Sequence, residues 1–273
     1  MITSPGNEKV KYVRELSAKA KLRKKEGCFV AEGIKMFLEA PEEEIQSVYV
    51  SEHLHTLLRG AADIPKNYKA CKEKLDRVGY EIVSDPAFER MADTVTPQGV
   101  LSIISAKKHS LDGLLKEDKR LFVILENLQD PGNLGTILRT AEAAGVGGII
   151  LSNDCVDIYN PKVIRSTMGA IYRVPFLYTE DLSKTIGLLK ESGISVYAAT
   201  LSEQAKEYDN CNYREDTAFI IGNEGNGLTK ETISKASEQI YIPMEGQGES
   251  LNASMAAGIL MYEANRQRRK GGI

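Results

Sequence analysis

The chain has 273 residues, enough for two domains of ordinary size, and 42% of them are hydrophobic, as in most proteins with a folded core. Its formal net charge of −3 does not by itself indicate a nucleic-acid partner. The four cysteines, Cys28, Cys71, Cys155 and Cys211, form no C-x-x-C pair, which argues against a zinc ribbon or a redox motif and predicts a reduced, metal-free cytoplasmic protein. No run approaches the roughly 18 apolar residues of a membrane span and no secretory signal opens the chain, so we expect neither export nor membrane insertion.

Basic residues concentrate at the two ends of the chain. Residues 1–25 carry eight lysines and arginines against two glutamates, and a second basic cluster lies at 266–270. Such clusters bind phosphates by releasing counterions. A solvated helix face and a frayed tail would explain the same pattern. The candidate RNA contacts at the amino end are Lys9, Lys11, Arg14, Lys21, Arg23, Lys24 and Lys25.

The first hundred residues combine a basic helix with four short apolar runs separated by helical segments. These runs predict strands at 28–31, 47–50, 80–83 and 99–105. Residues 106–119 are polar at both ends and lack a strand pattern, so they are the best candidate for a linker. We therefore expect one domain over 1–105 and a second over 120–273.

Beyond residue 120, short apolar runs alternate with helical patterns. The runs at 121–125, 148–151, 194–199, 218–221 and 239–243 have the length and continuity of buried parallel strands. After the first run, Leu134, Ile137, Leu138, Ala141 and Ala144 share one helix face, and Gly145 follows as a C-terminal cap. This alternation predicts an α/β domain with a parallel sheet.

The loop after the first of these strands runs from Asn127 into a helix. Asp130-Pro131-Gly132 is typical of a turn, and Asn133 suits the N-cap of the helix. The amides at the start of this helix and the guanidinium of Arg139 could hold an anion. Alternatively, Asn133 only caps the helix and Arg139 only faces solvent.

Two more loops of special composition follow later strands. GNEGNGL at 222–228 follows the strand at 218–221, and a loop over 242–252 follows the strand at 239–243. Ligands of open parallel sheets bind at the carboxyl edge, so three Gly- and Asn-rich loops there indicate a site for a small polar cofactor. The glycines could equally be plain turn residues.

Known signatures narrow the chemistry further. The chain has no G-x-x-x-x-G-K-[ST] phosphate loop and no G-x-G-x-x-G after its first strand, which disfavours ATP and NAD. Its three histidines, His53, His55 and His109, all precede residue 120. Nucleophile–histidine and histidine–metal chemistry therefore has little support in the second domain.

Taken together, the three loops resemble the SpoU/TrmH class of the SPOUT superfamily, which methylates RNA at the ribose 2′-hydroxyl. The pattern N-x-x-x-x-x-N-x-G-x-x-x-R-T-A spans 127–141, GNEGNGL spans 222–228, and IPM followed by ESLNASMAAG spans 242–258. The resemblance covers residues 120–266. The stretch 4–36 also resembles the substrate-binding domain of many such enzymes, which is related to small ribosomal RNA-binding proteins.

This resemblance implies S-adenosylmethionine as the cofactor and assigns site residues. Those expected to line the cofactor pocket are Thr200, Leu201, Gly222, Asn223, Glu224, Gly225, Ile242, Met244, Ser250 and Leu251. Those expected at the reacting ribose are Arg139, Asn133, Glu224, Ser250 and Asn252, with Arg139 on the ribose and its phosphate. Since a guanidinium is effectively always protonated, the identity of the general base stays open.

The resemblance also implies a C-terminal trefoil knot and a homodimer near the small-residue helix expected at 253–264. Ribosomal RNA is the expected substrate, because a separate N-terminal domain is typical of the ribosomal RNA members of the class. Three alternatives stay open: a transfer RNA ribose methyltransferase, a SPOUT enzyme acting on a base nitrogen, and an inactive RNA-binding or ribosome-assembly protein with this fold.

Overall fold

The computed structural model describes residues 1–60, 65–116, 120–248 and 250–271. The chain divides into two compact units, which we describe separately. Unit 1 comprises Met1–Lys107 and Asp157–Tyr172, and unit 2 comprises Lys108–Val156 and Arg173–Ile273. Within the described residues, no helix is both long and apolar enough to cross a membrane.

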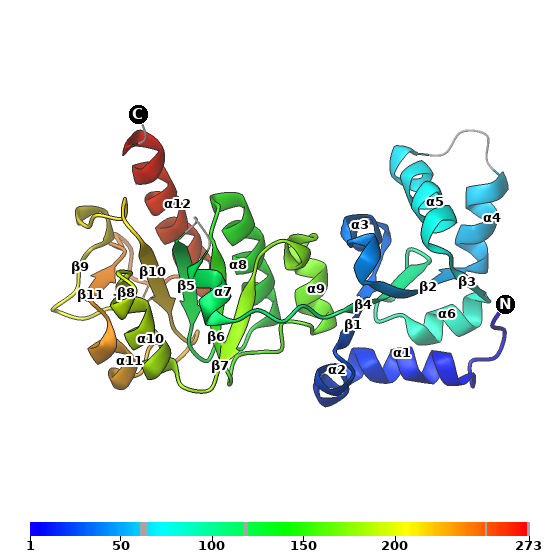
Figure 1. The fold of residues 1–273 in the computed structure, drawn as a ribbon, viewed down its shortest axis with the longest axis horizontal. Coiled ribbons are helices and arrows are strands. Elements are labelled where there is room, and N and C mark those ends of the chain that lie inside the picture. Colours follow the sequence, from blue (N-terminus) through cyan, green and yellow to red (C-terminus); the bar gives the residue numbers. More distant parts are fainter. Residues whose placement is uncertain (61–64, 117–119, 249, 272–273) are drawn as a thin grey trace. The chain divides into compact units, whose positions relative to one another are not determined.

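Unit 1 contains a four-stranded mixed sheet with the order β1-β4-β2-β3, in which β4 is antiparallel to both neighbours and β2 is parallel to β3 (Figure 1). Its strands are β1 (Cys28–Glu32), β2 (Ile45–Ser51), β3 (Glu81–Val83) and β4 (Val100–Ser105), which confirms the four predicted strands. Its helices are α1 (Glu8–Ala18), α2 (Ala20–Glu26), α3 (Ile34–Glu39), α4 (Glu52–Gly60), α5 (Lys66–Val78), α6 (Asp85–Met91) and α9 (Pro161–Thr167), with 3-10 turns η1 (Glu42–Glu44) and η2 (Ala170–Tyr172).

The basic amino-terminal segment forms two helices, because the backbone of Lys19 is extended, with φ −111° and ψ 104°, and separates α1 from α2. Helix α2 then ends at Gly27, which adopts the left-handed conformation with φ 63°. The buried positions of α1 are Val10, Val13 and Leu16, which recur every three residues along one face. That face joins α6 and the sheet in one hydrophobic core, so the lysines and arginines of α1 point outward.

The segment 157–172 follows β6 (Gly148–Ser152) in the chain but packs within unit 1. Arg23 of α2 is only 4% exposed and donates two hydrogen bonds to Asp157 Oδ2, from Nε at 2.9 Å and from Nη2 at 2.6 Å. The Phe29 and Tyr159 rings stack with centroids 4.3 Å apart. A buried ion pair and an aromatic stack therefore fix this segment on α2 and β1.

Unit 2 contains a seven-stranded sheet in which every neighbouring pair is parallel, with the order β7-β6-β5-β10-β8-β11-β9. Its other strands are β5 (Leu121–Leu125), β7 (Phe176–Thr179), β8 (Ser195–Ala199), β9 (Lys206–Glu207), β10 (Thr217–Ile221) and β11 (Glu238–Tyr241). The predicted parallel α/β fold is thus confirmed, with strands at all five predicted positions. The sequence does not indicate β7 and β9, which are edge strands: three of the four residues of β7 are only half-buried, and β9 is two exposed charged residues.

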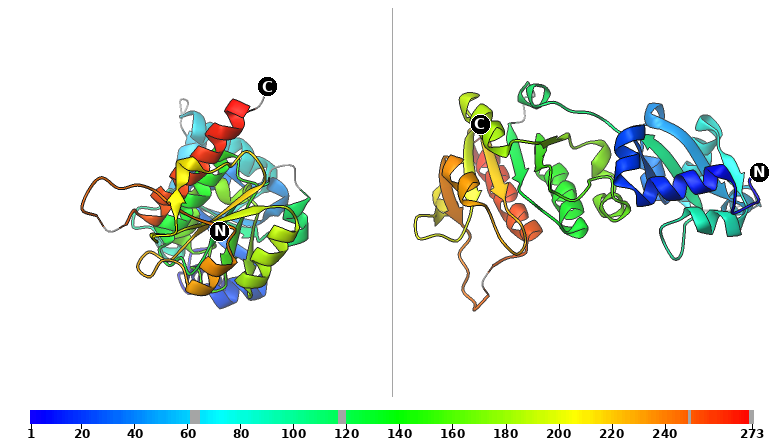
Figure 2. Two further views of the ribbon diagram at one scale, coloured as in Figure 1. Left: turned by 90° about the vertical axis from the view of Figure 1, so that its left-hand side faces the viewer. Right: turned by 90° about the horizontal axis from the view of Figure 1, so that it is seen from below.

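Helices cover both faces of this sheet (Figure 2). They are α7 (Leu111–Leu115), α8 (Pro131–Ala144), α10 (Leu182–Glu191), α11 (Lys230–Lys235) and α12 (Ala253–Gly271), with the 3-10 turn η3 (Tyr208–Asn210). Helices α7 and α10 share a hydrophobic core with Phe122 and Ile124 on one face, while α12 packs along α8 on the other. The expected linker therefore contains α7, whose Leu114 is buried in unit 2; its last three residues, 117–119, lie outside the described residues.

Helix α8 starts three residues earlier than expected. Asp130 is its N-cap, and the Asp130 carboxylate accepts a 2.7 Å hydrogen bond from the amide of Asn133. Pro131 occupies the first helical position, where its missing N–H costs no hydrogen bond. The prediction that Asn133 caps the helix is therefore wrong, and its side-chain amide is available for other partners. The helix ends at Gly145, with φ 74°, as predicted.

Candidate functional site

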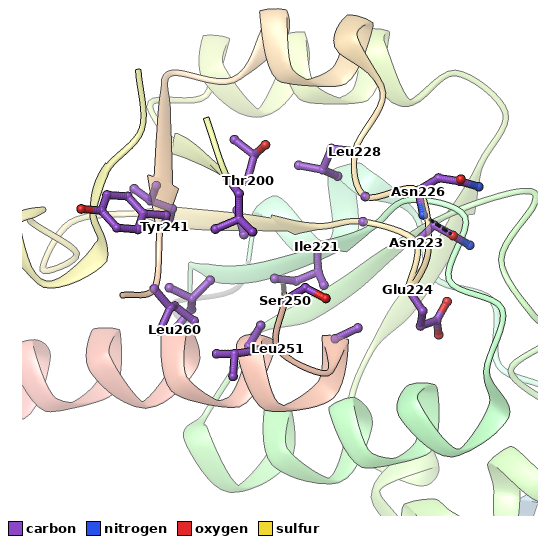
Figure 3. A pocket seen from close by; sticks show the side chains of 18 of the residues that line it. Thr200, Ile221, Asn223, Glu224, Asn226, Leu228, Tyr241, Ser250, Leu251 and Leu260 are labelled. Atoms are coloured by element: carbon purple, nitrogen blue, oxygen red, sulfur yellow. Dashed lines mark hydrogen bonds between the residues drawn. The ribbon is translucent and has the colours of Figure 1, made fainter. Parts of the chain in front are cut away.

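A cavity of about 360 Å³ lies at the carboxyl ends of β8, β10 and β11 and is closed on one side by the start of α12 (Figure 3). Three segments form its rim: 200–201 after β8, 222–228 after β10, and, after β11, the residues Ile242, Met244, Ser250 and Leu251. Because these strands are parallel neighbours in the sheet, their carboxyl ends meet at one edge. All ten residues expected to line the cofactor pocket line this cavity: Thr200, Leu201, Gly222, Asn223, Glu224, Gly225, Ile242, Met244, Ser250 and Leu251.

The cavity combines apolar walls with a polar rim. Four apolar side chains point into the same space: Ile221 from β10, Leu228 from the glycine loop, Leu251 from the residues before α12, and Leu260 from α12 (Figure 3). The segment 242–248, which supplies one side of the rim, extends away from the sheet (Figure 2). Apolar walls with a few polar groups suit a small organic ligand, and the volume lies within the usual range for such sites.

The glycine loop 222–228 is a tight turn that requires Gly222. Asn223 and Gly227 exchange two backbone hydrogen bonds of 3.1 and 3.0 Å, which bring the two ends of the turn together. A Cβ atom on Gly222 would overlap the backbone of Gly227 and lie 2.6 Å from the amide nitrogen of Leu228. Only glycine permits this close approach of backbone to backbone, so the loop shape depends on it.

Both polar atoms of the Asn223 side chain form hydrogen bonds within the protein. Its Oδ1 accepts from the amides of Gly225 and Asn226, both at 3.0 Å, and its Nδ2 donates to the Asn127 carbonyl at 2.8 Å. Asn127 itself has φ 54°, and its amide donates to Ser152 Oγ at 2.9 Å. Asn223 thus shapes the glycine loop and attaches it to the loop after β5.

Glu126 is a structural residue of the site that the sequence motifs do not single out. It is 6% exposed, and its carboxylate accepts from the amide and hydroxyl of Thr229, at 2.9 and 2.8 Å, and from the Thr232 hydroxyl at 2.6 Å. These bonds fix the start of α11, immediately after the glycine loop. The only sequence signal is its position, directly after β5 and one residue before the recognised motif.

Asn133 connects all three loops of the motif. Its Nδ2 donates to Glu224 Oε1 at 3.0 Å, and its Oδ1 accepts from Asn252 Nδ2 at 3.0 Å. Asn133 is 8% exposed, so both halves of its amide are satisfied within the protein. The loop after β5, the glycine loop and the start of α12 are therefore joined through one side chain.

The Glu224 carboxylate is held by donors on the β5 loop. Its two oxygens accept from the amides of Gln129, at 3.2 Å, and Asp130, at 3.0 Å, in addition to Asn133. Partial burial alone would raise the pKa of Glu224, but the hydrogen bonds from Asn133 and from backbone amides outweigh it and lower that pKa below its ordinary value. At neutral pH this side chain is an ionised acceptor.

Asn252 and Ser250 lie at the start of α12. Asn252 Oδ1 accepts from the amides of Ser254 and Met255, at 2.9 and 3.3 Å, so it caps α12 while its Nδ2 bonds to Asn133. Asn252 therefore caps α12 and bonds to Asn133 at the same time. Ser250 lines the cavity, is exposed, and its hydroxyl has no hydrogen bond to the described residues.

Arg139 is not part of this network. It lies on α8, about 120° around the helix from Asn133, is exposed, and has no ion pair or hydrogen bond within the described part of the chain. It does not line the cavity. Of the five residues expected at the ribose, the structure therefore joins Glu224, Asn133 and Asn252, places Ser250 on the cavity wall, and leaves Arg139 facing solvent.

The basic residues expected to contact RNA lie on α1 and α2 of unit 1, and all but one are exposed: Lys9, Lys11, Arg14, Lys21, Lys24 and Lys25. The exception is Arg23, whose guanidinium is occupied by Asp157 and by the carbonyls of Leu16 and Ser17. A buried, fully used guanidinium cannot reach a phosphate. We therefore remove Arg23 from the candidate RNA contacts; it holds the fold of unit 1.

Among the described residues, no group of three or more His, Cys, Asp or Glu side chains is arranged to hold a metal ion. The polar cluster around Asn133 consists mainly of amides and backbone groups, which donate and accept hydrogen bonds. The site is therefore built to orient a ligand through hydrogen bonds and shape.

Comparison with known proteins covers both parts of the chain. Residues 120–262 match the SpoU rRNA Methylase family, and residues 7–102 match the MRM3-like substrate binding domain. An uncharacterized tRNA/rRNA methyltransferase from Synechocystis is 33% identical, with 98% of this chain and 94% of that protein covered. The 23S rRNA (guanosine(2553)-2′-O)-methyltransferase RlmP from Bacillus subtilis is 31% identical, with 96% and 97% covered. The structure of an AdoMet-bound rRNA methyltransferase from Sinorhizobium meliloti has a TM-score of 0.80 and 28% identity, covering 97% of each chain.

The first prediction concerns Gly222. A side chain at this position forces the two ends of the glycine loop apart, so Gly222→Ala should weaken binding of S-adenosylmethionine by about tenfold or more, the effect of roughly 1–3 kcal/mol of backbone strain. Isothermal titration calorimetry measures this affinity. The control is Gly187→Ala on α10, outside the cavity, where the new Cβ would meet nothing within 4 Å. Equal affinities for the two variants would contradict the role assigned to Gly222.

The second prediction follows from the lowered pKa of Glu224. Its ionised form stabilises the fold fully above pH 4.5, the ordinary value, and this contribution is lost as the pH falls through the lower pKa of the folded state. Glu224→Gln should therefore reduce the free energy of unfolding at pH 7, and the difference from wild type should shrink as the pH falls below about 4.5. Urea titrations between pH 7 and 3 test this, with Glu245→Gln at an exposed, unpaired position as control. A difference that stays constant with pH would refute the ionised acceptor.

Proposed function

The chain belongs to the SpoU rRNA methylase family, and from this premise we propose that it transfers a methyl group from S-adenosylmethionine to a ribose 2′-hydroxyl of ribosomal RNA. The observation that carries the proposal is the Glu224–Asn133–Asn252 network beside a cavity of about 360 Å³ at the carboxyl edge of a parallel sheet. Asn133, Glu224 and Asn252, which are distant in sequence, meet there.

The cavity has the properties that S-adenosylmethionine requires. Gly222 lets the two ends of the glycine loop close at the rim of the cavity, and Leu228, Leu251 and Leu260 supply apolar walls suited to an adenine ring. Thr200 and Ser250 add polar groups at the rim. When bound, the cofactor supplies an electrophilic methyl group on a sulfonium; the protein must place the ribose oxygen in line with it, about 3–3.5 Å away.

We propose that Ser250 and the hydrogen-bonded residues Asn133, Glu224 and Asn252 orient the ribose. Glu224 is a poor candidate for the general base, because its lowered pKa makes it a weak base and donors already occupy both its oxygens. Arg139 is exposed and unpaired in the described structure, so its planar guanidinium is available to hold the substrate phosphate and to stabilise the developing alkoxide. The group that accepts the hydroxyl proton stays unassigned.

Unit 1 is proposed to bind the RNA. Support comes from the match of residues 7–102 to a substrate binding domain and from the exposed basic residues of α1 and α2. We keep the division of labour expected from the sequence, with RNA recognition in the amino-terminal part and methyl transfer in the part after residue 120. Helix α9 and its flanking residues, although they follow β6, add to unit 1.

The oligomeric state and the knotted topology expected from the family resemblance are also proposals. We propose a C-terminal trefoil knot and a homodimer in the cytoplasm. Two of the small residues of α12, Ala257 and Ala264, are buried, and α12 packs along α8 of the same chain. These residues therefore support the dimer less directly than the sequence suggested. Instead, Met255 and Tyr262 are 58% and 47% exposed on α12, and these large apolar side chains supply a surface for a second copy.

The third prediction tests the substrate. Deleting the gene should remove one or a few ribose methylations from ribosomal RNA and leave those of transfer RNA unchanged. Mapping of 2′-O-methylations in both RNA pools decides between them, and the position named for the Bacillus relative, guanosine 2553 of 23S rRNA, is the first to inspect. Loss confined to transfer RNA would favour the alternative substrate. Unchanged methylation in both pools, together with no methyl transfer by purified protein, would favour the inactive RNA-binding alternative.

The fourth prediction concerns Arg139. Arg139→Ala should slow single-turnover methyl transfer by about 100-fold or more, because a positioned donor at developing charge commonly contributes that much. Affinity for S-adenosylmethionine should stay unchanged, since Arg139 does not line the cavity. Arg139→Lys should restore little activity, because lysine keeps the charge and loses the planar fork.

The matched control for Arg139 is Arg214→Ala, which removes another exposed arginine of unit 2 whose side chain has no partner among the described residues. This control should retain wild-type turnover. Near-normal turnover by Arg139→Ala would show that Arg139 is only a solvated helix residue.

A further inference from the structure

Unit 1 has a small basic hollow on its surface, separate from the cavity of unit 2. Its volume is about 250 Å³, and it lies between α1, α6 and the turn that precedes α1. Helices α1 and α6 are side by side in unit 1 (Figure 1). The residues that line it are Pro5, Gly6, Val10, Lys11, Arg14 and Arg90.

Three positive charges border this hollow, and no acidic side chain among the described residues lines it. Lys11, Arg14 and Arg90 are exposed, and none has an ion pair or side-chain hydrogen bond within the described structure. Other lysines of α1 and its C-terminal boundary differ: Lys9 pairs with Glu81, and Lys19 pairs with Glu15 at 3.1 Å. Like charges gathered without a counter-charge repel one another, and an anion in the hollow would remove that repulsion.

The fold places these three cations together. Lys11 and Arg14 are three residues apart on α1 and so lie on neighbouring turns of one face. The adjoining face of α1, with Val10, Val13 and Leu16, is buried in the core that also contains Phe88 and Met91 of α6. Anchoring both helices in one core fixes the position of Arg90 beside the α1 pair.

A second cavity described in unit 1 differs in charge. It is larger, about 410 Å³, and its lining includes Asp85 and Glu89 from the same helix α6. Carboxylates there repel a phosphate, whereas the basic hollow presents only cations and apolar or backbone groups. The two sides of α6 are therefore suited to different chemistry, and only the side with Arg90 is suited to an anion.

We propose that the basic hollow binds a backbone phosphate of the RNA substrate, with Arg14 and Arg90 gripping its oxygens and Lys11 adding a third charge. This inference rests on the proposed function, because it takes RNA as the ligand of unit 1. It assigns a defined role to Arg90, which lies far from the basic amino-terminal cluster in the sequence. Phosphate binding of this kind fixes the position of RNA without reading its bases.

The test is a triple variant, Lys11→Gln, Arg14→Gln and Arg90→Gln, in the full chain. Its affinity for a 23S ribosomal RNA transcript should fall, and the slope of log affinity against log salt concentration should become shallower by about 0.7–0.9 for each phosphate that is no longer neutralised. Affinity for S-adenosylmethionine should match wild type, which shows that unit 2 is intact, and a circular-dichroism melting curve like that of wild type shows that unit 1 is folded. If the triple variant does not fold, Arg90→Gln alone provides the same two readouts.

The matched control is Arg59→Gln, Lys66→Gln and Lys69→Gln, which removes three exposed charges of α4 and α5 whose side chains have no partner among the described residues. Its salt slope should stay close to wild type. Equal losses in the two triple variants, or an unchanged slope in the hollow variant, would overturn the inference. Methyl transfer by the wild-type protein is measured in parallel, so failure of the enzymatic proposal is seen separately from failure of this site.

Discussion

The geometry of the site depends on the side-chain amide of Asn133. Asn133 donates to Glu224 through its nitrogen and accepts from Asn252 through its oxygen, both at 3.0 Å. These two partners lie on loops that follow different strands, and Asn133 lies at the start of a third segment, helix α8. Because an amide has distinct donor and acceptor ends, it can join an ionised carboxylate to the nitrogen of another amide, and an aspartate or leucine of similar size could not.

The parallel sheet makes this arrangement possible. Strand β10 lies between β5 and β8, and β11 is next to β8, so the loops that follow these strands meet at one edge. Side chains then fix the loops: Asn223 attaches the glycine loop to Asn127, and Glu126 fixes the start of α11. The glycine loop is therefore held by side chains outside the cavity, and its shape is set before any ligand binds.

Much of this could be predicted from the sequence, because the buried strands of a parallel sheet are continuous apolar runs and the motif loops follow them directly. The edge strands β7 and β9 could not, since one is half-exposed and the other has only two residues. The start of α8 differs from the prediction because Asp130 and Asn133 are both good caps, and only the backbone geometry decides between them. In the sequence Arg23 resembles its neighbours in a basic run, yet it is buried by Asp157, which lies 134 residues further along the chain. Long-range pairing of this kind leaves no local pattern.

Hydrogen–deuterium exchange in an Asn133→Asp variant tests the central role of this side chain most directly. The substitution keeps the size of the side chain and replaces the donor that faces Glu224 with a carboxylate oxygen. We expect faster exchange both in the glycine loop 222–228 and in the first turn of α12, segments joined to Asn133 only through its side chain, while the middle of α8 stays protected. Exchange that is unchanged in both segments would contradict the claim that Asn133 holds the site together.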